Sequence, residues 1–402
     1  MDAARPLEDP LDNTCNMTLL LTRACQLACA YCRMDRNPAS SMEEPVLRRA
    51  VDLLMSGPSP SVALDFSGGE PLLRFELIRR GILYATRSAR SRGKSLRLDL
   101  STNGLLLDEG KAAFLLRRGV RIHVSSDGSL RTHARNRPPA RGPARSAAER
   151  CRAALSLLAR LRAPFDATMV VFPEDVPVMA RNARHLMDAG ASVVQIDYAL
   201  GVTWSREQAS DLAEGLGACV LEARRRRALG AQVAVESSCF GNPDLNSALM
   251  AIDTDGTILM GCTPTVEATC PTLAGILRFG SVYARRNLQG LRRTPSEMAR
   301  FILSSLRPER ERRLFVNNLA VGLAVRAALA SRGLAPVPSG APRTQRPSAG
   351  APSRPARWTG RPVERWILGE LAALEEELGS MPSRGAWDGP GPTGSAGGRT
   401  SA

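Results

Sequence analysis

Three cysteines lie within eight residues of one another near the start of the chain. Cys25, Cys29 and Cys32 form a Cys-x3-Cys-x2-Cys run with Tyr31 directly before the third cysteine, and the apolar stretch 17–22 before them is typical of a strand. Three thiolates on one short loop can ligate three irons of a 4Fe–4S cluster and leave the fourth iron open. An open iron can bind a small chelating molecule, so the run predicts a catalytic iron–sulfur site.

Two other uses of clustered cysteines stay open at this point. A zinc site needs a fourth ligand, usually Cys or His, and the histidines at 123, 133 and 185 are all distant in sequence. Disulfides are the second use. The odd total of nine cysteines, the length of 402 residues and a polar start without a signal-peptide pattern argue against them. The sequence therefore predicts a cytoplasmic protein.

A second group of residues follows the next predicted strand. Gly68, Gly69, Glu70 and Pro71 come directly after the strand predicted at 61–67. Glycine lets a backbone approach a ligand closely, and proline suits the first turn of a helix. The Glu70 carboxylate can accept hydrogen bonds from a ligand ammonium group. Taken alone, the same four residues are also typical of a plain strand-to-helix turn.

Polar turns close the later strands as well. Taken singly, each is ordinary turn and helix-cap chemistry, because Ser, Asn and Asp favour such positions. His133 and Arg137 could merely brace a loop, and Glu174 could merely cap a helix. The polar residues that follow the third, fourth and fifth predicted strands include Ser101, Asn103, Ser125, His133, Arg137 and Glu174.

Taken in series, these motifs resemble the radical SAM superfamily, and in particular its SPASM/twitch branch, which commonly modifies peptides and proteins. The resemblance rests on the cysteine run, the Gly-Gly-Glu-Pro segment, Ser-Thr-Asn-Gly at 101–104 and Ser-Ser-Asp-Gly at 125–128. It covers about residues 17–290 and is most specific over the first 140. It implies one 4Fe–4S cluster on the three cysteines, with S-adenosylmethionine on the open iron.

The activity that the resemblance implies is reductive cleavage of S-adenosylmethionine to a 5′-deoxyadenosyl radical, which abstracts hydrogen from unactivated carbon. By the same resemblance, Tyr31, Gly68–Pro71, Ser101, Asn103 and Ser125 surround the cofactor. A peptide or protein substrate is expected, with an electron donor such as flavodoxin or ferredoxin. The alternative is a non-catalytic iron–sulfur or zinc-binding protein that retains the fold.

The resemblance is weaker in the C-terminal half. Residues 252–262 and 279–283 are similar to the start of a SPASM or twitch module, in which cysteines hold an auxiliary cluster. Cys239, Cys262 and Cys270 are the candidate ligands here, and no cysteine follows Cys270. We therefore expect a degenerate module without an auxiliary cluster.

The elements that position these motifs follow a regular alternation, which predicts an α/β fold with a partial (β/α)6 TIM-type barrel. Every motif then lies at the carboxyl ends of the strands, where barrel sites are built. The predicted strands are 17–23, 61–67, 95–101, 120–126, 165–172 and 192–199, and the predicted helices are 43–56, 75–92, 108–118, 146–162, 176–189 and 205–229.

The rest of the chain is predicted as smaller parts. A small α+β module should contain a strand at 233–237, a hairpin at 248–252 and 257–261, and helices at 296–306 and 309–332. The predicted division is an N-terminal extension 1–16, the barrel 17–230, the SPASM/twitch-like module 231–334, a disordered linker 335–361, an amphipathic helix 362–379 and a disordered tail 380–402.

The composition is strongly basic, with a formal net charge of +15. Such a charge can indicate a nucleic-acid or anionic membrane partner. Lys94 and Lys111 are the only lysines, so 52 of the 54 basic residues are arginine, a bias that GC-rich coding also produces. Aromatic residues make up only 4%, which leaves little for base stacking. No run of about 18 uncharged apolar residues occurs. We therefore expect neither a nucleic-acid nor a membrane partner.

Overall fold

The computed structural model describes residues 15–238, 249–261, 263–293 and 295–334. The strands are β1 (Asn16–Leu20), β2 (Ser61–Ser67), β3 (Ser95–Thr102), β4 (Val120–Ser125), β5 (Phe165–Val171), β6 (Val193–Tyr198), β7 (Ala234–Glu236), β8 (Met250–Ile252), β9 (Thr257–Met260) and β10 (Arg278–Ser281). The helices are α1 (Glu44–Ser56), α2 (Phe75–Ser91), α3 (Glu109–Arg117), α4 (Leu130–Asn136), α5 (Ala144–Arg160), α6 (Val176–Asp188), α7 (Arg206–Ala228), α8 (Thr263–Val266), α9 (Pro271–Ile276), α10 (Pro295–Ser305) and α11 (Glu309–Ser331).

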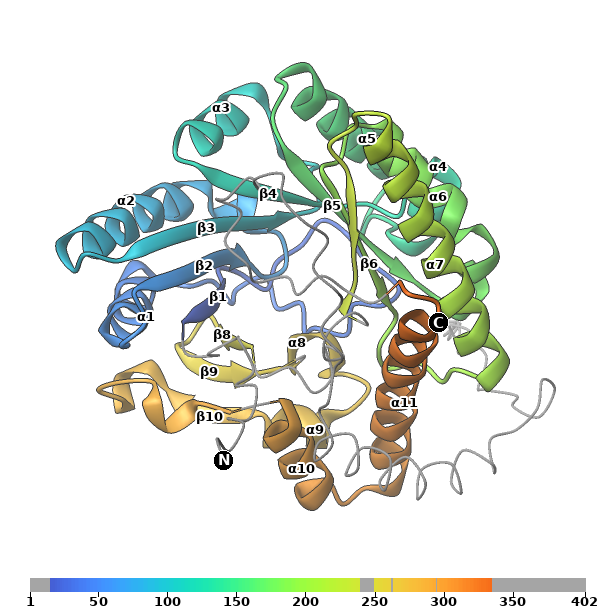
Figure 1. Ribbon diagram of the computed structural model, residues 1–402. Coiled ribbons are helices and arrows are strands. Elements are labelled where there is room, and N and C mark those ends of the chain that lie inside the picture. Colours follow the sequence, from blue (N-terminus) through green and yellow to red (C-terminus); the bar gives the residue numbers. More distant parts are fainter. Residues whose placement is uncertain (1–14, 239–248, 262, 294, 335–402) are drawn as a thin grey trace, which may run out of the picture.

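All of these strands belong to one sheet in the order β10-β9-β8-β1-β2-β3-β4-β5-β6-β7. Strands β1 to β7 are parallel, and the helices between them cover the outside of the curved sheet (Figure 1). This arrangement confirms the predicted α/β fold and partial barrel. Each of the six predicted strands and helices agrees with its observed counterpart to within three residues at either end.

The hairpin of the predicted second module continues the barrel sheet. Residues 17–19 of β1 pair in parallel with residues 250–252 of β8, and β9 and β10 follow in antiparallel pairs. The last helix, α11, packs on α7 beside the other edge of the sheet. The predicted module therefore shares the sheet of the barrel at β1.

The core lies between the sheet and its outer helices. A Cβ built on Gly81 of α2 would lie 2.9 Å from Cε1 of Phe66 and 3.0 Å from Cδ1 of Leu47 on α1, so this face is closely packed. Residues two apart on a strand share a face. Phe66 and Leu64 are both completely buried and face the helices. Their neighbour Asp65 therefore faces the inside of the barrel.

Four short elements were absent from the prediction: α4, α8, α9 and β10. Each has fewer than eight residues, too few to show a hydrophobic period. In α4 the signal is local, because the Ser129 hydroxyl accepts a hydrogen bond from Thr132 N (3.3 Å) and caps the helix. The predicted linker, amphipathic helix and tail lie outside the described residues.

Within the described residues, α11 is the one helix long and apolar enough to cross a membrane, a test that buried helices of globular proteins also pass. Here more than half of its apolar stretch is buried. The Asn318 amide also accepts from Gly201 N (2.8 Å) and donates to Val202 O (2.7 Å). These contacts are those of a helix that packs on the loop after β6.

Candidate functional site

The cysteine loop follows β1 at the carboxyl end of the barrel strands. Residues 26–30 run antiparallel to residues 136–140, with three backbone hydrogen bonds of 2.7 to 2.8 Å between them. The second segment directly follows α4, a helix that the sequence prediction lacked. The loop that carries the thiols is therefore supported by a segment more than 100 residues away in sequence.

The three thiols lie close enough to influence one another. Burial, helped by the nearby thiols of Cys29 and Cys32, raises the pKa of Cys25 to about 12. Burial likewise raises the pKa of Cys29. The Cys25 and Cys29 thiols therefore hold their protons when no metal is bound, and metal binding must release these protons.

The Gly68–Gly69 turn lies directly against the start of the cysteine loop. A Cβ on Gly69 would lie 2.2 Å from the carbonyl oxygen of Ala24, and a Cβ on Gly68 would lie 2.5 Å from that of Thr22. Gly69 N donates to Thr22 O (2.7 Å), and Glu70 N donates to Ala24 O (2.8 Å). In this structure Gly68 and Gly69 lack the side chains that would clash with the backbone of the cysteine loop. The contact of these glycines with the cofactor remains a prediction.

Glu70 is completely buried and joins the ends of two neighbouring strands. Its carboxylate accepts from Leu72 N (2.9 Å), the Thr102 hydroxyl (2.7 Å) and Asn103 N (2.8 Å). Burial outweighs these three donors and raises the pKa of Glu70. A carboxylate has about four acceptor positions, so one remains for the predicted ammonium group. Pro71 starts the single 3₁₀ turn that follows, as its fixed φ favours.

Asn103 brings the end of β3 to the cysteine loop. Its Nδ2 lies 3.8 Å from Cys25 Sγ and 3.3 Å from Gln26 Oε1, while its Oδ1 accepts from Leu105 N (2.9 Å). The Gln26 Nε2 atom is buried without a hydrogen-bond partner in the described structure. Gln26 was not among the predicted site residues, and its only signal in the sequence is its position between two of the cysteines.

A buried ion pair holds the other side of the loop. Arg137 donates from Nε and Nη2 to the two carboxylate oxygens of Asp127, both at 2.9 Å. The Arg137 guanidinium also lies over the Tyr31 ring, 5.0 Å from its centroid, a favourable cation–π distance. Tyr31 thus lies beside Arg137, which directly follows α4 and supports the cysteine loop.

The remaining predicted residues occupy different places. Ser101 donates to Asp65 (3.2 Å) inside the barrel, and Ser125 ends β4 in register with Thr168. His133 is buried, which lowers its pKa to about 4 and keeps the imidazole neutral. Glu174 is exposed at the surface. Its neighbour Asp175 is the buried carboxylate and accepts from Asn136 Nδ2 (2.7 Å).

Arg23, directly before the loop, connects it to the C-terminal part of the chain. Arg23 is 6% exposed, and its guanidinium contacts Asp253 (2.6 Å) and Glu267 (2.8 Å). The two carboxylates raise the pKa of Arg23 despite its burial. This contact could not be predicted from the sequence, because the partners lie 230 and 244 residues away.

We expect replacement of Arg23 by methionine to destabilise the protein by about 3–5 kcal/mol, because the change leaves two buried carboxylates without their cation. Urea unfolding of the purified chain measures this loss. The matched control is Arg313→Met, which removes an exposed pair with Glu309 and should cost at most about 1 kcal/mol. Equal losses in the two variants would contradict the assigned role of Arg23.

The predicted auxiliary ligands are only partly described. Cys270 is buried at 2% exposure in the hydrophobic core, whereas Cys239 and Cys262 lie outside the described residues. Burial raises the pKa of the Cys270 thiol to about 11. Cys270 has the surroundings of a small core residue, and the absence of an auxiliary cluster stays a prediction.

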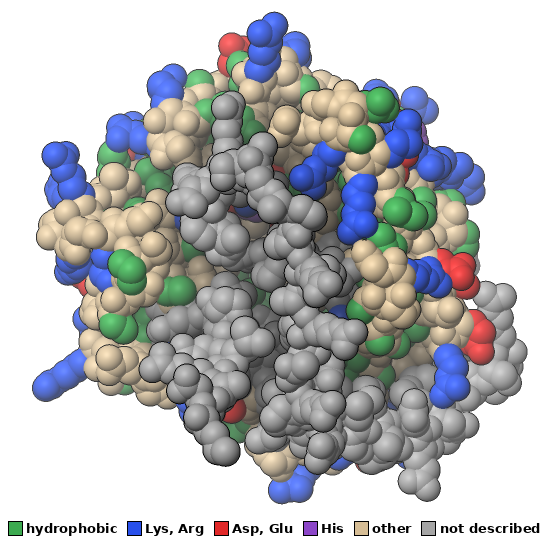
Figure 2. Space-filling view, viewed as in Figure 1, with side chains coloured by type: hydrophobic (Ala, Val, Ile, Leu, Met, Phe, Trp, Pro, Cys, Tyr) green, Lys and Arg blue, Asp and Glu red, His purple; other side chains and the backbone are tan. Residues whose placement is uncertain are grey.

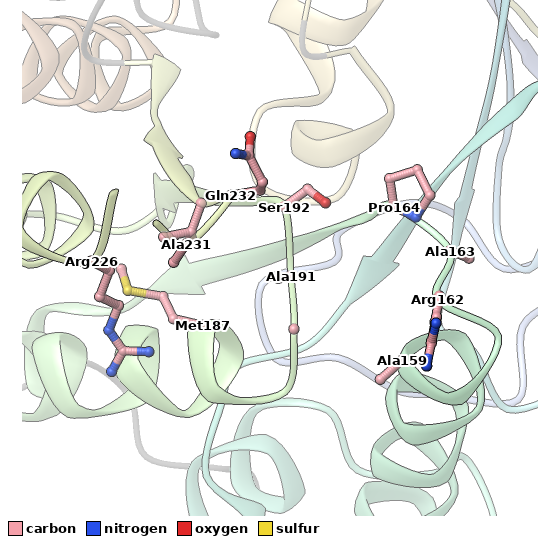
Figure 3. Close-up of a pocket in the computed structure, with 12 residues that line it drawn as sticks. Ala159, Arg162, Ala163, Pro164, Met187, Ala191, Ser192, Arg226, Ala231 and Gln232 are labelled. Carbon is pink, nitrogen blue, oxygen red and sulfur yellow. The ribbon is translucent and has the colours of Figure 1, made fainter. Parts of the chain in front are cut away.

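A pocket of about 420 Å³ lies at the opposite end of the barrel (Figure 3). It is lined by residues that precede β5, β6 and β7, among them Pro164, Ser192 and Gln232. Arg226 at its edge is already paired with Glu222 and Asp188. In barrel enzymes the amino ends of the strands serve stability. We therefore do not assign the chemistry to this pocket.

The donor set of the loop fits a 4Fe–4S cluster in type and number, since three partly buried thiols are grouped on one loop. In the part of the chain that the structure describes, no three Cys, His, Asp or Glu side chains converge as metal ligands do. The backbone at Gly68 and Gly69 approaches this loop closely, so the carboxyl end of β2 lies directly beside it.

Comparison with known proteins agrees with this site. A family described as the radical SAM superfamily matches residues 19–176, which include the loop, the glycine turn and α4. The serine-type anaerobic sulfatase-maturating enzyme of Klebsiella aerogenes is 27% identical over 178 residues, 43% of either chain. The AdoMet-dependent heme synthase of Oleidesulfovibrio alaskensis is 33% identical over 133 residues, 32% of either chain. The chain thus spans less than half the length of these two relatives.

Solved structures show the same fold at lower sequence identity. The structure of anSMEcpe with bound AdoMet superimposes with a TM-score of 0.61 at 17% identity, over 79% of this chain and 93% of the other. The same protein has also been solved with AdoMet and a Cp18Cys peptide, and that structure gives a TM-score of 0.60 at 18% identity, over 79% and 97% of the two chains. Residues 19–176 of this chain therefore form a radical SAM domain.

Proposed function

We propose that this chain cleaves AdoMet reductively and uses the product radical to abstract hydrogen from a peptide or protein substrate. The observation that carries the proposal is the buried support of the cysteine loop by three separate segments. These are the Gly68–Glu70 turn, Asn103 at the end of β3 and residues 136–140. An iron–sulfur protein that only transfers electrons does not need the end of a second barrel strand beside its cysteine thiols.

The residues have separable tasks in this proposal. Cys25, Cys29 and Cys32 would hold a 4Fe–4S cluster, which supplies the electron that breaks the carbon–sulfur bond of AdoMet. Glu70 has one acceptor position left for an ammonium group, and its other three hold the strand ends in place. The loop after β1 lies at the carboxyl end of the barrel strands, where its hydrogen bonds to residues 136–140 would hold the cluster ligands in place.

Two relationships support a peptide substrate. The sulfatase-maturating enzyme is a relative of this chain, and anSMEcpe, which shares the fold, has been solved with a peptide. The heme synthase relative makes a small-molecule substrate the competing proposal. We further propose a cytoplasmic location and a reduced flavodoxin or ferredoxin as electron donor, because free thiols and the cluster need reducing conditions.

The first experiment tests the reaction itself. After anaerobic reconstitution with iron and sulfide, we expect about four irons per chain, as one cluster requires. Reductant and AdoMet should then yield 5′-deoxyadenosine, measured by liquid chromatography. Bound zinc, or intact AdoMet in the presence of strong reductant, would support the non-catalytic alternative. About eight irons per chain would indicate that an auxiliary cluster is also bound.

A second experiment tests the substrate class. Cells of the source organism are grown on deuterated medium and separated into a peptide fraction and a small-molecule fraction. Each fraction is added to the reconstituted enzyme, and deuterium is measured in 5′-deoxyadenosine by mass spectrometry. Transfer from the peptide fraction is the expected result. Transfer from the small-molecule fraction alone would contradict the peptide proposal.

A further inference from the structure

The side chain of Gln26 has a buried hydrogen-bond donor without an acceptor, in the middle of the cysteine loop. The backbone of this residue is fixed, because its carbonyl oxygen accepts from Ala140 N (2.7 Å). Its side-chain oxygen, Oε1, accepts from Asn103 Nδ2 (3.3 Å) at the end of β3. The other atom of the amide, Nε2, is buried and has no hydrogen-bond partner among the described residues. Buried polar side-chain atoms normally have a partner, so this donor requires an explanation.

A backbone donor determines the orientation of both amides. The Asn103 atom that faces Leu105 N (2.9 Å) must be the oxygen, because a backbone N–H can only donate. The nitrogen of Asn103 therefore faces Gln26, and the Gln26 atom that it contacts must be the oxygen. Turning either amide by half a turn would bring two donors together. The unpartnered atom of Gln26 is therefore the nitrogen, which has hydrogen to donate.

This pair of amides lies beside the sulfur of Cys25. Asn103 Nδ2 is 3.8 Å from Cys25 Sγ, a distance at which an N–H can still donate to sulfur. Leu27 N donates to the same sulfur (3.4 Å). Nε2 of Gln26 is bonded to the same carbon as Oε1, so it lies next to this group of donors. Hydrogen-bond donors grouped in this way are suited to an anionic acceptor.

We propose that Gln26 donates a hydrogen bond from Nε2 to a sulfur atom of the 4Fe–4S cluster and thereby raises the reduction potential of that cluster. Asn103 holds the Gln26 amide in the required orientation. Reduction adds negative charge to the cluster, so a donor to sulfur stabilises the reduced state more than the oxidised state. Hydrogen bonds to the sulfurs are among the factors that set such potentials. This role rests on the cluster of the proposed function.

The carboxylate of AdoMet is the other anion that the proposed function brings to this end of the barrel. Cluster sulfur is favoured, because Gln26 lies between Cys25 and Cys29 in the chain and its amide partner already contacts Cys25 Sγ. The two acceptors lead to different results. A hydrogen bond to sulfur affects the reduction potential before AdoMet is added, whereas a hydrogen bond to AdoMet leaves that potential unchanged and affects the affinity for AdoMet.

The first test measures the reduction potential of the reconstituted protein without AdoMet, by electron paramagnetic resonance at a series of poised potentials. Gln26→Met keeps a side chain of similar length and removes the donor. We expect the equilibrium constant for one-electron reduction to fall by about tenfold, a shift of about 59 mV to more negative potential, as loss of one charge-assisted hydrogen bond allows. The matched control is Gln232→Met, the same change at an exposed residue at the opposite end of the barrel. The control should leave the potential unchanged.

An unchanged or raised potential in Gln26→Met, or an equal fall in Gln232→Met, would overturn the proposal. The affinity for AdoMet is measured on the same proteins by equilibrium dialysis. Weaker binding of AdoMet at an unchanged potential would assign the donor to AdoMet and would also overturn the proposal.

A second measurement does not depend on cluster assembly in the variant. The unmodified chain is made by cell-free synthesis with ¹⁵N in the side-chain amide of glutamine, then reconstituted and reduced. Pulsed electron paramagnetic resonance should detect coupling of the cluster spin to a ¹⁵N nucleus, because the proposed hydrogen bond places Nε2 of Gln26 against a cluster sulfur. Gln195, the next glutamine along the chain, donates its amide to Asp197 instead. Absence of the coupling would overturn the proposal.

The iron content of the unmodified protein and its cleavage of AdoMet test the proposed function separately. A protein that binds no cluster would contradict both the proposed function and the role of Gln26. A protein that holds its cluster and cleaves AdoMet, but shows neither the shift in potential nor the ¹⁵N coupling, would contradict the role of Gln26 alone.

Discussion

Replacement of Cys29 by alanine is expected to abolish both iron binding and AdoMet cleavage. Even residues that only support metal ligands typically contribute 10- to 100-fold to metal affinity or activity. Loss of a ligand should therefore lower 5′-deoxyadenosine formation by more than about a hundredfold. The two measurements are iron per chain after anaerobic reconstitution and 5′-deoxyadenosine formed per chain.

The matched control is Cys219→Ala, which removes a buried thiol from α7 at 2% exposure. This thiol belongs to the core and lies on a helix that packs on α6 and α11, so the variant should retain its iron. A Cys29→Ala protein with a full complement of iron and undiminished cleavage would refute the three-cysteine site. Loss of iron in both variants would indicate general unfolding.

Replacement of Gly69 by alanine is expected to have the second largest effect. The new Cβ would lie 2.2 Å from the carbonyl oxygen of Ala24 and 2.7 Å from its carbon, and neither is a side-chain atom that could rotate away. The cysteine loop must therefore move. Overpacking of this kind costs roughly 1–3 kcal/mol of stability. A displacement of about 1 Å at a reacting site can cost about a hundredfold in rate, which sets the expected loss of AdoMet cleavage.

Gly275→Ala in α9 is the matched control, because a Cβ at that position meets no atom within 4 Å. Alanine is also preferred over glycine within a helix, so the control should be neutral or slightly stabilising. Chemical denaturation and AdoMet cleavage are measured for both variants. If Gly69→Ala retained full cleavage, the close approach of the turn to the loop would not matter for function.

The arginine-rich surface gives no comparable prediction. Figure 2 shows basic side chains spread around the rim of one face of the molecule, with single acidic side chains among them. Several surface arginines are already paired along helices, such as Arg313 with Glu309 and Arg79 with Glu76. The basic composition therefore does not by itself identify a binding surface.

Much of the fold and site could be predicted from local patterns. The alternation of apolar runs defined six strands and six helices, because burial on one face imposes a period that is visible within ten residues. The spacing of Cys25, Cys29 and Cys32 and the glycines of the second turn indicated the radical SAM site, since ligands on one loop must be close in sequence. Short elements such as α4 were not predicted, because they are defined by a capping residue and are too short to show a hydrophobic period.

Sequence alone determined which residues could do the chemistry and the order of the elements that carry them. Only the tertiary structure decided which distant residues support them: residues 136–140 behind the thiols, Asp253 and Glu267 around Arg23, and β8 beside β1. It also decided that Asp99 pairs with Arg97 and His123 whereas Asp65 accepts from the Ser101 hydroxyl, although both are aspartates on neighbouring strands. The physical reason is that a contact between distant segments depends on how the sheet curves and pairs, and no local pattern encodes that geometry.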